Sequence, residues 1–585
     1  MTTLQSIRLT EVKLPLDHAP EAINAAVCER LKLKADEIQS INIFRRGFDA
    51  RKKSDIHFIY TLDVQTTDNA AVLARAQRVP KLATHTTPTP DTSYKFVTHA
   101  PDKPFQRPVV IGTGPCGLFA ALTLAQMGFK PIVLERGKAV RERTKDTWGF
   151  WRKSQLQTES NVQFGEGGAG TFSDGKLWSQ VKDPLHHGRK VLEDMVRAGA
   201  PDEIMFVSKP HVGTFRLVKV VEFLREEICA LGGEFRFSSK VTDISLEKQP
   251  VAQGNAAQTA IKGVALEDGT QISADHVVLA IGHSARDTFE MLHAKGVYVE
   301  AKPFSVGFRI EHPQGLIDRA RFGPYAGNAM LGAADYKLVH HARNGRSVYS
   351  FCMCPGGTVV AATSEAGRVV TNGMSQYSRN ERNANAGIVV GINPEDFDYN
   401  ALGQPLCAEI DRGHPLAGMR FQRALESGAY LLGGSNYEAP GQLVGDYVKG
   451  IASSALGSVE PSYKPGVHLT DLGNPGQPSL PMYAIEAIRE ALPAFAKQIA
   501  GFDMHDAVLT GIETRTSAPI RIKRHEDRGL AKTDANLQRY QSINTAGLYP
   551  AGEGAGYAGG IMSAAIDGIK VAEAVALNIV RAAQA

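Results

Sequence analysis

Residues Val109–Gly137 read VVIGTGPCGLFAALTLAQMGFKPIVLERG, an apolar strand, a glycine turn, a small-residue helix and a second strand. In such a unit Gly112 permits the tight strand-to-helix turn, Gly114 lets backbone approach a pyrophosphate, and Gly117 lets the helix pack closely on the sheet. Pro115 falls near the first helical position, where a missing N–H costs little. The other N–H groups of a helix start favour phosphate. Because all these features arrive in register, the stretch predicts a dinucleotide site.

Glu135 ends the second strand of this unit, 21 residues after Gly114. An acidic side chain at that place accepts hydrogen bonds from ribose hydroxyls. Its carboxylate would repel a 2′-phosphate, so NADP is disfavoured at this site.

The size and composition are those of an ordinary globular chain with two to four domains. The 585 residues carry a formal net charge of +4, which argues against a polyanion binder or a membrane-surface protein. No apolar run approaches the ~18–20 residues of a membrane span, and the start of the chain lacks a signal-peptide pattern. Six scattered cysteines do not make a disulfide framework or a metal site, so we expect a cytoplasmic protein without a bound metal.

The region before the glycine turn has the pattern of a separate domain, followed by a Thr- and Pro-rich linker at Thr84–Lys103. A strand–helix–strand–strand–helix order suggests a ferredoxin-like sandwich, which is a topology and not an iron–sulfur site. The expected elements are Ser6–Leu14, Glu21–Leu33, Ile38–Arg45, Asp55–Val64 and Asn69–Val79.

A basic cluster lies between the two middle strands of that domain: Arg45, Arg46, Arg51, Lys52 and Lys53. An anion or RNA contact is one interpretation. A solvated hairpin tip is the other, and we favour it because charge runs are usually solvated.

A second glycine-rich stretch, NVQFGEGGAGTFSDGKL, occupies Asn161–Leu177. Such glycine density indicates backbone held close to a ligand or in positive-φ turns. A flexible surface loop is the alternative, but the flanking apolar side chains argue against exposure. We favour a second segment that contacts the phosphates and a ring of the ligand.

The middle of the chain is expected to complete the nucleotide-binding half and then change character. Glu234–Ile244 is predicted to be a strand, followed by a β-meander and by the buried parallel strand His276–Ile281. Residues 301–500 contain scattered strands and many glycines, typical of a substrate or cap domain. Within them Cys352 and Cys354 would share one face of a strand. A flavin-coupled dithiol is conceivable, but two buried inert thiols are favoured.

The C-terminal stretch Gly547–Gly568, GLYPAGEGAGYAGGIMSAAIDG, again combines a short strand, a glycine turn and a small-residue helix. A second glycine turn before a helix implies that the C-terminus folds back onto the same ligand. The expected architecture is α/β: a Rossmann-like domain of three layers with a β-meander, interrupted by an α+β substrate domain and preceded by the ferredoxin-like domain. The boundaries are 1–98 with the linker, 99–300, 301–500 and 501–585.

The combination resembles FAD-dependent oxidoreductases of the p-hydroxybenzoate hydroxylase and geranylgeranyl reductase type of fold. More closely, it is similar to a bacterial family of uncharacterised FAD-dependent dehydrogenases with an N-terminal ferredoxin-like domain. The segments that carry the resemblance are FDARKK, GTGPCGLFAALTLAQMG, FGEGGAGTFSDGKL, KPHVGTFRL, FSVGFRIEHPQ, FCMCPGG, ETRTSAPIRI and the C-terminal glycine block.

The resemblance implies a role for each matching position. Gly112, Gly114 and Gly117 would hold the FAD pyrophosphate, with Glu135 on the adenosine ribose and Arg136 beside it. Gly167–Thr171 would approach the flavin or its phosphates, and Val241 would contact adenine through its backbone. Two motifs depart from the family: Gly282 closes Ala-Ile-Gly instead of Ala-Thr-Gly, and Gly552-Glu553 replaces a pair that usually ends in Asp and binds ribityl and phosphate. Gly560 and Ile561 would direct N–H groups toward flavin N1/O2.

We expect hydride transfer through flavin N5 to or from a small-molecule substrate held by residues 301–500. No second GxGxxG follows a strand, so any NAD(P)H would bind transiently. Lys176 and Arg515 are the candidate catalytic residues; Arg515 could anchor a carboxylate, or form a structural ion pair with Glu513. A flavin-dependent RNA-modifying enzyme and a non-catalytic flavin-binding protein remain alternatives. The near-neutral charge disfavours a nucleic-acid partner, and the sequence does not set the oligomeric state.

Overall fold

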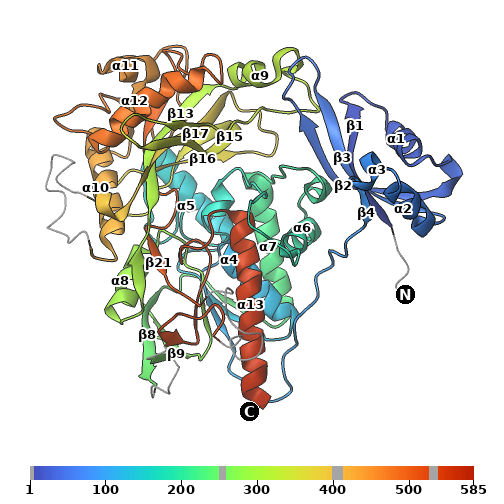
Figure 1. Cartoon of the computed structure of the whole chain (residues 1–585). Helices are drawn as coiled ribbons and strands as arrows, with labels where there is room; N and C mark the ends of the chain where they lie inside the picture. Colours follow the sequence, from blue (N-terminus) through green and yellow to red (C-terminus); the bar gives the residue numbers. More distant parts are fainter. Residues whose placement is uncertain (1–5, 250–258, 398–412, 526–537, 585) are drawn as a thin grey trace.

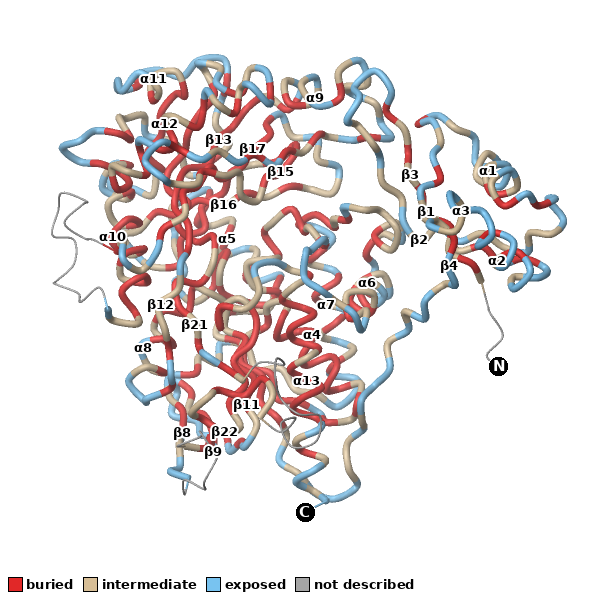
Figure 2. The backbone as a smooth tube through the Cα atoms, viewed as in Figure 1, coloured by how far each residue is buried: buried red, intermediate tan, exposed pale blue. Residues whose placement is uncertain are grey.

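The protein is described by a computed structural model that covers residues 6–249, 259–397, 413–525 and 538–584. Figure 1 shows a main body built around two large sheets, with the N-terminal region packed at its side. The most continuous buried backbone lies in the strands of the main body and in two helices beneath them, α4 (Pro115–Gln126) and α13 (Ile561–Gln584) (Figure 2). None of the helices in the described ranges combines the length and apolar character needed to span a bilayer.

The N-terminal region forms a four-stranded antiparallel sheet in the order β2-β3-β1-β4. Alternating residues of β3 are buried, and Val27, Leu31 and Val72 from the helices complete this core. The elements are β1 (Ile7–Pro15), α1 (Ala22–Leu31), β2 (Ile38–Asp49), β3 (His57–Thr66), α2 (Asn69–Gln77), α3 (Pro80–Ala83) and β4 (Thr86–Pro88).

Two details of this region differ from the sequence prediction. Strand β2 continues past Arg45 to Asp49, because it stays paired with β3 as far as His57. Arg46 also contacts the main body, since its N–H donates to the Phe206 carbonyl at 2.7 Å. Arg45 and Arg46 are therefore strand residues, and only Arg51–Lys53 lie at the turn. Residues 86–88, expected in the linker, form the edge strand β4.

A five-stranded parallel sheet forms the centre of the lower body, in the order β23-β11-β5-β6-β7. Helices α4 and α13 pack against each other over one face, with α7 beside α4. The last strand and last helix of the chain thus return to the sheet that starts at Val109. The elements are β5 (Val109–Ile111), β6 (Ile132–Leu134), α5 (Val140–Lys153), α6 (His187–Arg197), α7 (Thr214–Ala230), β7 (Glu234–Arg236), β11 (Val277–Leu279) and β23 (Leu548–Pro550).

A small antiparallel meander covers the opposite face of the parallel sheet and shares a core with it. The predicted single strand 234–244 is wrong here: it divides into β7 of the parallel sheet and β8 of the meander. The break falls near Ser238, whose positive φ of +50° cannot continue a strand. The elements are β8 (Val241–Lys248), β9 (Thr259–Leu266), β10 (Gln271–Ser273), α8 (Arg286–Ala294) and β22 (Thr545–Ala546).

An eight-stranded sheet forms the upper body, in the order β14-β15-β17-β13-β20-β18-β19 with β16 paired to β15. Its central strands β13 and β17 are buried along nearly their whole length. The sheet includes β20, although the substrate domain was expected to end at residue 500. The long helix α10 was also not expected from the sequence. The elements are β13 (Phe304–Pro313), α9 (Gln314–Phe322), β14 (Val339–His341), β15 (Ser347–Ala361), β16 (Thr371–Ser375), β17 (Asn383–Ile392), α10 (Ala417–Leu432), β18 (Ala439–Leu443), α11 (Val444–Lys449), β19 (Val467–Leu469), α12 (Met482–Ala496) and β20 (Val508–Glu513). A two-stranded ribbon of β12 (Val299–Ala301) and β21 (Ile520–Ile522) lies below it.

Candidate functional site

A cavity of about 620 Å³ lies where the parallel sheet, the glycine-rich loop and the eight-stranded sheet meet. Most residues predicted to hold a cofactor line it: Gly112, Gly114, Pro115, Glu135, Arg136, Gly168, Ala169, Gly170, Val241, Gly282, Glu553, Gly560 and Ile561. Four predicted residues, Gly117, Gly167, Thr171 and Gly552, are not among its lining residues. The cavity therefore joins the first glycine turn, near residue 112, with the C-terminal glycine turn, near residue 560.

Two glycines of the first turn are required by the fold itself. Gly112 has φ of +96°, and a Cβ on it would overlap the carbonyl oxygen of Ala280. A Cβ on Gly117 would overlap the carbonyl oxygen of Gly112. These glycines let β5, α4 and the end of β11 pack closely, whether or not a ligand is bound.

Gly114 is different, because its own backbone and neighbours do not require glycine. Its φ and ψ are −66° and 178°, and the atom nearest to a Cβ would be the Gly168 Cα, at 3.9 Å. Gly114 lines the cavity and precedes α4, whose start has no side-chain cap in the described part of the chain. A ligand that approaches the backbone closely explains the glycine, and the helix start favours a phosphate there.

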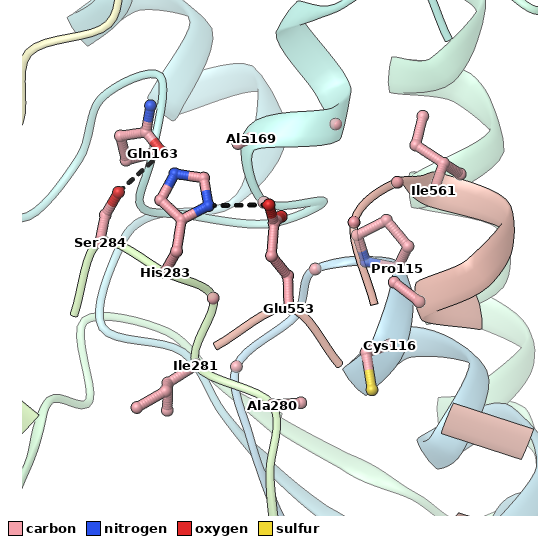
Figure 3. A pocket seen from close by; sticks show the side chains of 18 of the residues that line it. Pro115, Cys116, Gln163, Ala169, Ala280, Ile281, His283, Ser284, Glu553 and Ile561 are labelled. Carbon is pink, nitrogen blue, oxygen red and sulfur yellow. Dashed lines mark hydrogen bonds and ion pairs between the residues drawn. The ribbon is translucent and has the colours of Figure 1, made fainter. Parts of the chain in front are cut away.

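Gly560 repeats this arrangement at the start of α13. A Cβ on it would meet only the Ser563 Oγ, at 3.8 Å, so space is again left on the cavity side. The two helix starts face the same loop, since a Cβ on Gly170 would lie 3.1 Å from Ile561 Cγ1 and 3.5 Å from Pro115 Cγ. Figure 3 shows Pro115 and Ile561 at these neighbouring helix starts. Two positive helix ends on one cavity favour a ligand with more than one electron-rich group, such as a dinucleotide cofactor.

The glycine-rich loop has the positive-φ turns that the sequence predicted. Gly165, Gly167 and Gly168 have φ of +117°, +86° and +60°. The loop is tied to the first turn, because the Gly167 N–H donates to the Thr113 carbonyl at 2.9 Å. Thr171 lies behind the cavity wall, where it is buried and its carbonyl accepts from Thr214 Oγ1 at 2.6 Å.

Arg143 holds this loop from behind, a role that the sequence analysis missed. Its fully buried guanidinium donates to the carbonyls of Asn161, Val162 and Glu166, each at 2.7 Å. Burial lowers the pKa of Arg143 to about 10 despite the carboxylates of Glu135 and Glu166 nearby. Nothing in the local sequence of a charged helix distinguishes this arginine from its neighbours.

The carboxylate of Glu135 is already supplied with hydrogen bonds by the protein. It accepts from the N–H and hydroxyl of Thr113 at 3.0 and 2.6 Å, from Gly137 N–H at 2.9 Å and from Gly165 N–H at 3.0 Å. Four donors match the acceptor sites of a carboxylate. Glu135 thus ties the first turn to the glycine-rich loop, and its contact with a ribose stays a prediction.

Arg136 borders the same end of the cavity but is held by other residues. Its guanidinium forms ion pairs with Asp287 and Glu159 at 2.8 and 2.7 Å and lies 4.1 Å above the Phe164 ring. Burial opposes the charge of Arg136, but these two carboxylates raise its pKa above the usual value.

His283 and Glu553 form a pair on the cavity wall that was not assigned from the sequence. The His283 Nδ1 lies 3.2 Å from Glu553 Oε1, and neither ring nitrogen has hydrogen-bond geometry to a described group. Figure 3 shows the imidazole and the carboxylate side by side, and to their left the Ser284 hydroxyl, which donates to Gln163 Oε1 at 2.9 Å. Their polar atoms are available to a ligand.

Lys176 lies at the opposite end of the cavity, next to β15. Its Nζ is 3.2 Å from Asp174 Oδ2 and 3.9 Å from Cys354 Sγ. Burial opposes its charge, but Cys354 and Asp174 raise the pKa of Lys176 above the usual value. A fixed cation on the cavity wall can hold a carbonyl or carboxylate oxygen.

Arg515 and Glu513 do not form the ion pair considered from the sequence. Arg515 forms a bidentate pair with Glu426 at 3.0 and 2.9 Å and also donates to Ser284 and Ser364. Glu513 instead pairs with Arg309 at 2.7 Å. Both pairs join segments far apart in sequence, so local spacing could not predict them. Arg515 borders the cavity, yet most of its donors are used by the protein, and its catalytic role stays a prediction.

Comparisons with known proteins agree with this geometry. Residues 106–297 match the family described as pyridine nucleotide-disulphide oxidoreductase, residues 303–516 match "FAD-dependent protein, C-terminal domain-like", and residues 6–65 match a domain of unknown function. A Clostridium beijerinckii protein, described as an uncharacterized protein, is 45% identical over 575 residues, which span 97% of this chain and 98% of the relative.

Solved structures show weaker likeness. L-Amino acid deaminase from Proteus myxofaciens is 12% identical, with 83% of this chain and 93% of that chain covered at a TM-score of 0.32. The E. coli quinol fumarate reductase subunit FrdA is also 12% identical, with 82% and 71% covered at a TM-score of 0.30.

The chain belongs to a family of FAD-dependent oxidoreductases, together with the Clostridium beijerinckii relative. The cavity fits FAD: it leaves space at Gly114 and Gly560 that a Cβ would fill, and two helix starts face it. The protein is therefore an FAD-dependent oxidoreductase.

Proposed function

We propose that this enzyme transfers a hydride between the flavin N5 of its FAD and a small molecule bound against the eight-stranded sheet. FAD supplies the two-electron chemistry of such a reaction. One observation carries the proposal: the cavity that holds the glycine turns continues to Phe351, Cys352 and Asn372, which belong to β15 and β16. A substrate bound next to these three residues would therefore lie in the same cavity as the cofactor.

We assign cofactor binding and substrate binding to different residues of the cavity wall. The start of α13, at Gly560 and Ile561, presents backbone N–H groups that would stabilise negative charge on the cofactor ring. At the other end, Lys176 would hold a carbonyl or carboxylate oxygen of the substrate. The neighbouring Phe351 and Trp178 would exclude water from the reacting atoms.

The finer family assignment is part of the proposal. A parallel sheet with a meander on one face supports a fold of the p-hydroxybenzoate hydroxylase and geranylgeranyl reductase type. The strand order β2-β3-β1-β4, with helices after the first and third strands, supports a ferredoxin-like N-terminal domain. We further propose a cytoplasmic enzyme that acts without a nucleic-acid partner.

The electron donor is proposed to be a nicotinamide that binds transiently, because the sequence has no second strand-linked glycine fingerprint. Anaerobic addition of NADH or NADPH to the FAD-loaded protein tests this. We expect one of the two to bleach the absorbance peaks near ~375 and ~450 nm. If neither nucleotide nor any substrate from a panel of carboxylates and carbonyl compounds changes the spectrum, hydride transfer in this cavity is wrong.

A further inference from the structure

Cys352 lies where strand β15 departs from regular pairing and borders the cavity. The register of β15 against β17 shifts between Phe351 and Cys354, and Cys352 has φ of +42°. A left-handed conformation is unfavourable for a residue other than glycine. Bulges and such strained residues concentrate at functional sites, where they direct a side chain. At Cys352 the departure places a half-buried thiol on the cavity wall.

The charges around this thiol are unbalanced in favour of cations. Lys176 and Arg379 both pair with Asp174, at 3.2 and 2.5 Å, and Arg309 pairs with Glu513 at 2.7 Å. Three cations therefore face two carboxylates, and the buried carboxylates are almost completely shielded from solvent. An additional anion would balance the cluster, and a thiolate is the anion that the neighbouring residues can supply.

Cys354 is the second thiol of this cluster and is fully buried. Its S–H donates to the backbone carbonyl oxygen of Cys352 at 3.4 Å, and Lys176 Nζ lies 3.9 Å from Cys354 Sγ. Gly373 makes the arrangement possible, because a Cβ there would lie 2.5 Å from Arg309 Nη1 and 2.9 Å from Cys354 Sγ. The missing side chain at Gly373 of β16 thus leaves room for both the Cys354 thiol and the Arg309 guanidinium.

The pKa directions agree with this geometry. A hydrogen bond from Cys354, together with the charges of Lys176 and Arg309, holds the pKa of Cys352 well below its usual range against burial. The same hydrogen bond and burial raise the pKa of Cys354. Asp174 opposes ionisation of Cys352, but Asp174 itself pairs with Arg379, and burial lowers the pKa of the nearby His211. His283, Glu513 and Tyr336 are further titratable groups near the cluster.

We propose that Cys352 is a nucleophilic thiolate of the cavity, which forms a covalent bond with a soft electrophilic carbon of a small molecule. In the simplest case Sγ donates an electron pair to the carbon, an S–C bond forms, and a leaving group departs with its bonding pair. No oxidant is required for this step. Cys354 acts as a positioning residue that stabilises the thiolate, and the proposal does not depend on the direction of hydride transfer.

Alkylation of the FAD-loaded enzyme by iodoacetamide tests this reactivity, with iodide as the leaving group. Labelling rates of Cys352 and of the exposed Cys229 are compared by peptide mass spectrometry between pH 6 and pH 9. Cys229 serves as the internal reference because it is an exposed thiol whose pKa is not lowered: burial raises it. We expect Cys352 to react at least about tenfold faster than Cys229 at pH 6.5, because each unit of pKa changes the thiolate fraction tenfold.

The labelling of variants distinguishes a reactive Cys352 thiolate from a cysteine that is only accessible to the reagent. Cys352→Ser should keep FAD and lose the fast labelling, whereas Cys354→Ala should move the pH profile of Cys352 labelling upward. Cys354→Ser, which keeps a hydrogen-bond donor, should retain most of the fast labelling. If Cys352 reacts only in parallel with Cys229, or resists both iodoacetamide and the smaller methyl methanethiosulfonate while FAD stays bound, the proposal is overturned.

Discussion

Gly168 and Gly114 face each other so closely that a Cβ added to Gly168 would lie 2.8 Å from the Gly114 Cα. The contact joins the glycine-rich loop to the first turn, two stretches recognised separately in the sequence. A side chain on Gly168 would push against Gly114, whereas one on Gly114 would meet no protein atom closer than 3.9 Å and would take up space at the cavity.

Gly168→Ala is therefore expected to displace the loop from the first turn and to weaken FAD binding. Gly269→Ala is the matched control, because Gly269 also has positive φ, +88°, but no atom lies within 4 Å of its Cβ position. Both variants carry the conformational cost of alanine at positive φ, about 1 kcal/mol. FAD content after purification should fall only for Gly168→Ala. Equal FAD content in the two variants would contradict the role of this contact.

Gly114→Ala and Gly117→Ala should fail in different ways. The Gly117 variant would place a methyl group against the Gly112 carbonyl oxygen, so its apoprotein should unfold at a lower temperature or not fold. The Gly114 variant meets nothing closer than 3.9 Å, so its apoprotein should melt close to wild type while its FAD affinity falls. Thermal unfolding with and without FAD separates the two; a Gly114 variant with unchanged affinity would show that this glycine does not face the cofactor.

Much of the fold and the cofactor end of the site could be predicted because their signals are local. The strand, glycine turn and helix at 109–126 lie within one unit, and the positive-φ glycines of the loop follow from their density. The return of the C-terminal strand and helix was predicted from a second glycine turn, and β23 pairs with β11.

The parts that could not be predicted depend on contacts between distant segments. Arg143 holds a loop about twenty residues away, and His283 meets Glu553 from another part of the chain. Arg515 pairs with Glu426 on α10, a helix that was not predicted from the sequence. Strand β7 separates from β8 because Ser238 adopts positive φ, which residue preferences do not anticipate.

Arg515→Met is expected to act mainly on stability. It would leave the fully buried Glu426 with Arg286 as its remaining ion-pair partner, at a cost of about 3 kcal/mol in unfolding free energy. Arg343→Met is the control, because the Arg343 side chain in its pair with Glu490 is almost fully exposed, and a surface ion pair of this kind should contribute little to stability. Urea unfolding measures both. A stable Arg515→Lys variant with abolished turnover would instead establish that Arg515 contacts the substrate.

His187 should make stability depend on pH in the alkaline range. Burial opposes its charge, but Asp183 and Glu573, at 3.3 and 3.1 Å, raise the pKa of His187 to about 9. A pKa raised in the folded state stabilises fully below the unfolded value of about 6.5, and this stability is lost as pH rises through about 9. The contribution is on the order of 3 kcal/mol.

Urea unfolding of wild type and His187→Gln at several pH values tests this linkage. The difference between the two proteins should be largest near pH 6 and should shrink by pH 10. A difference that stays constant across this range would show that His187 contributes through packing alone.

The FAD content of the wild-type protein tests the central claim most directly. The purified chain, reconstituted with FAD and freed of excess, should show flavin absorbance equivalent to about one FAD per chain, and Gly114→Ala should reduce it. A folded wild-type chain that retains no FAD after reconstitution would contradict the assignment of this cavity.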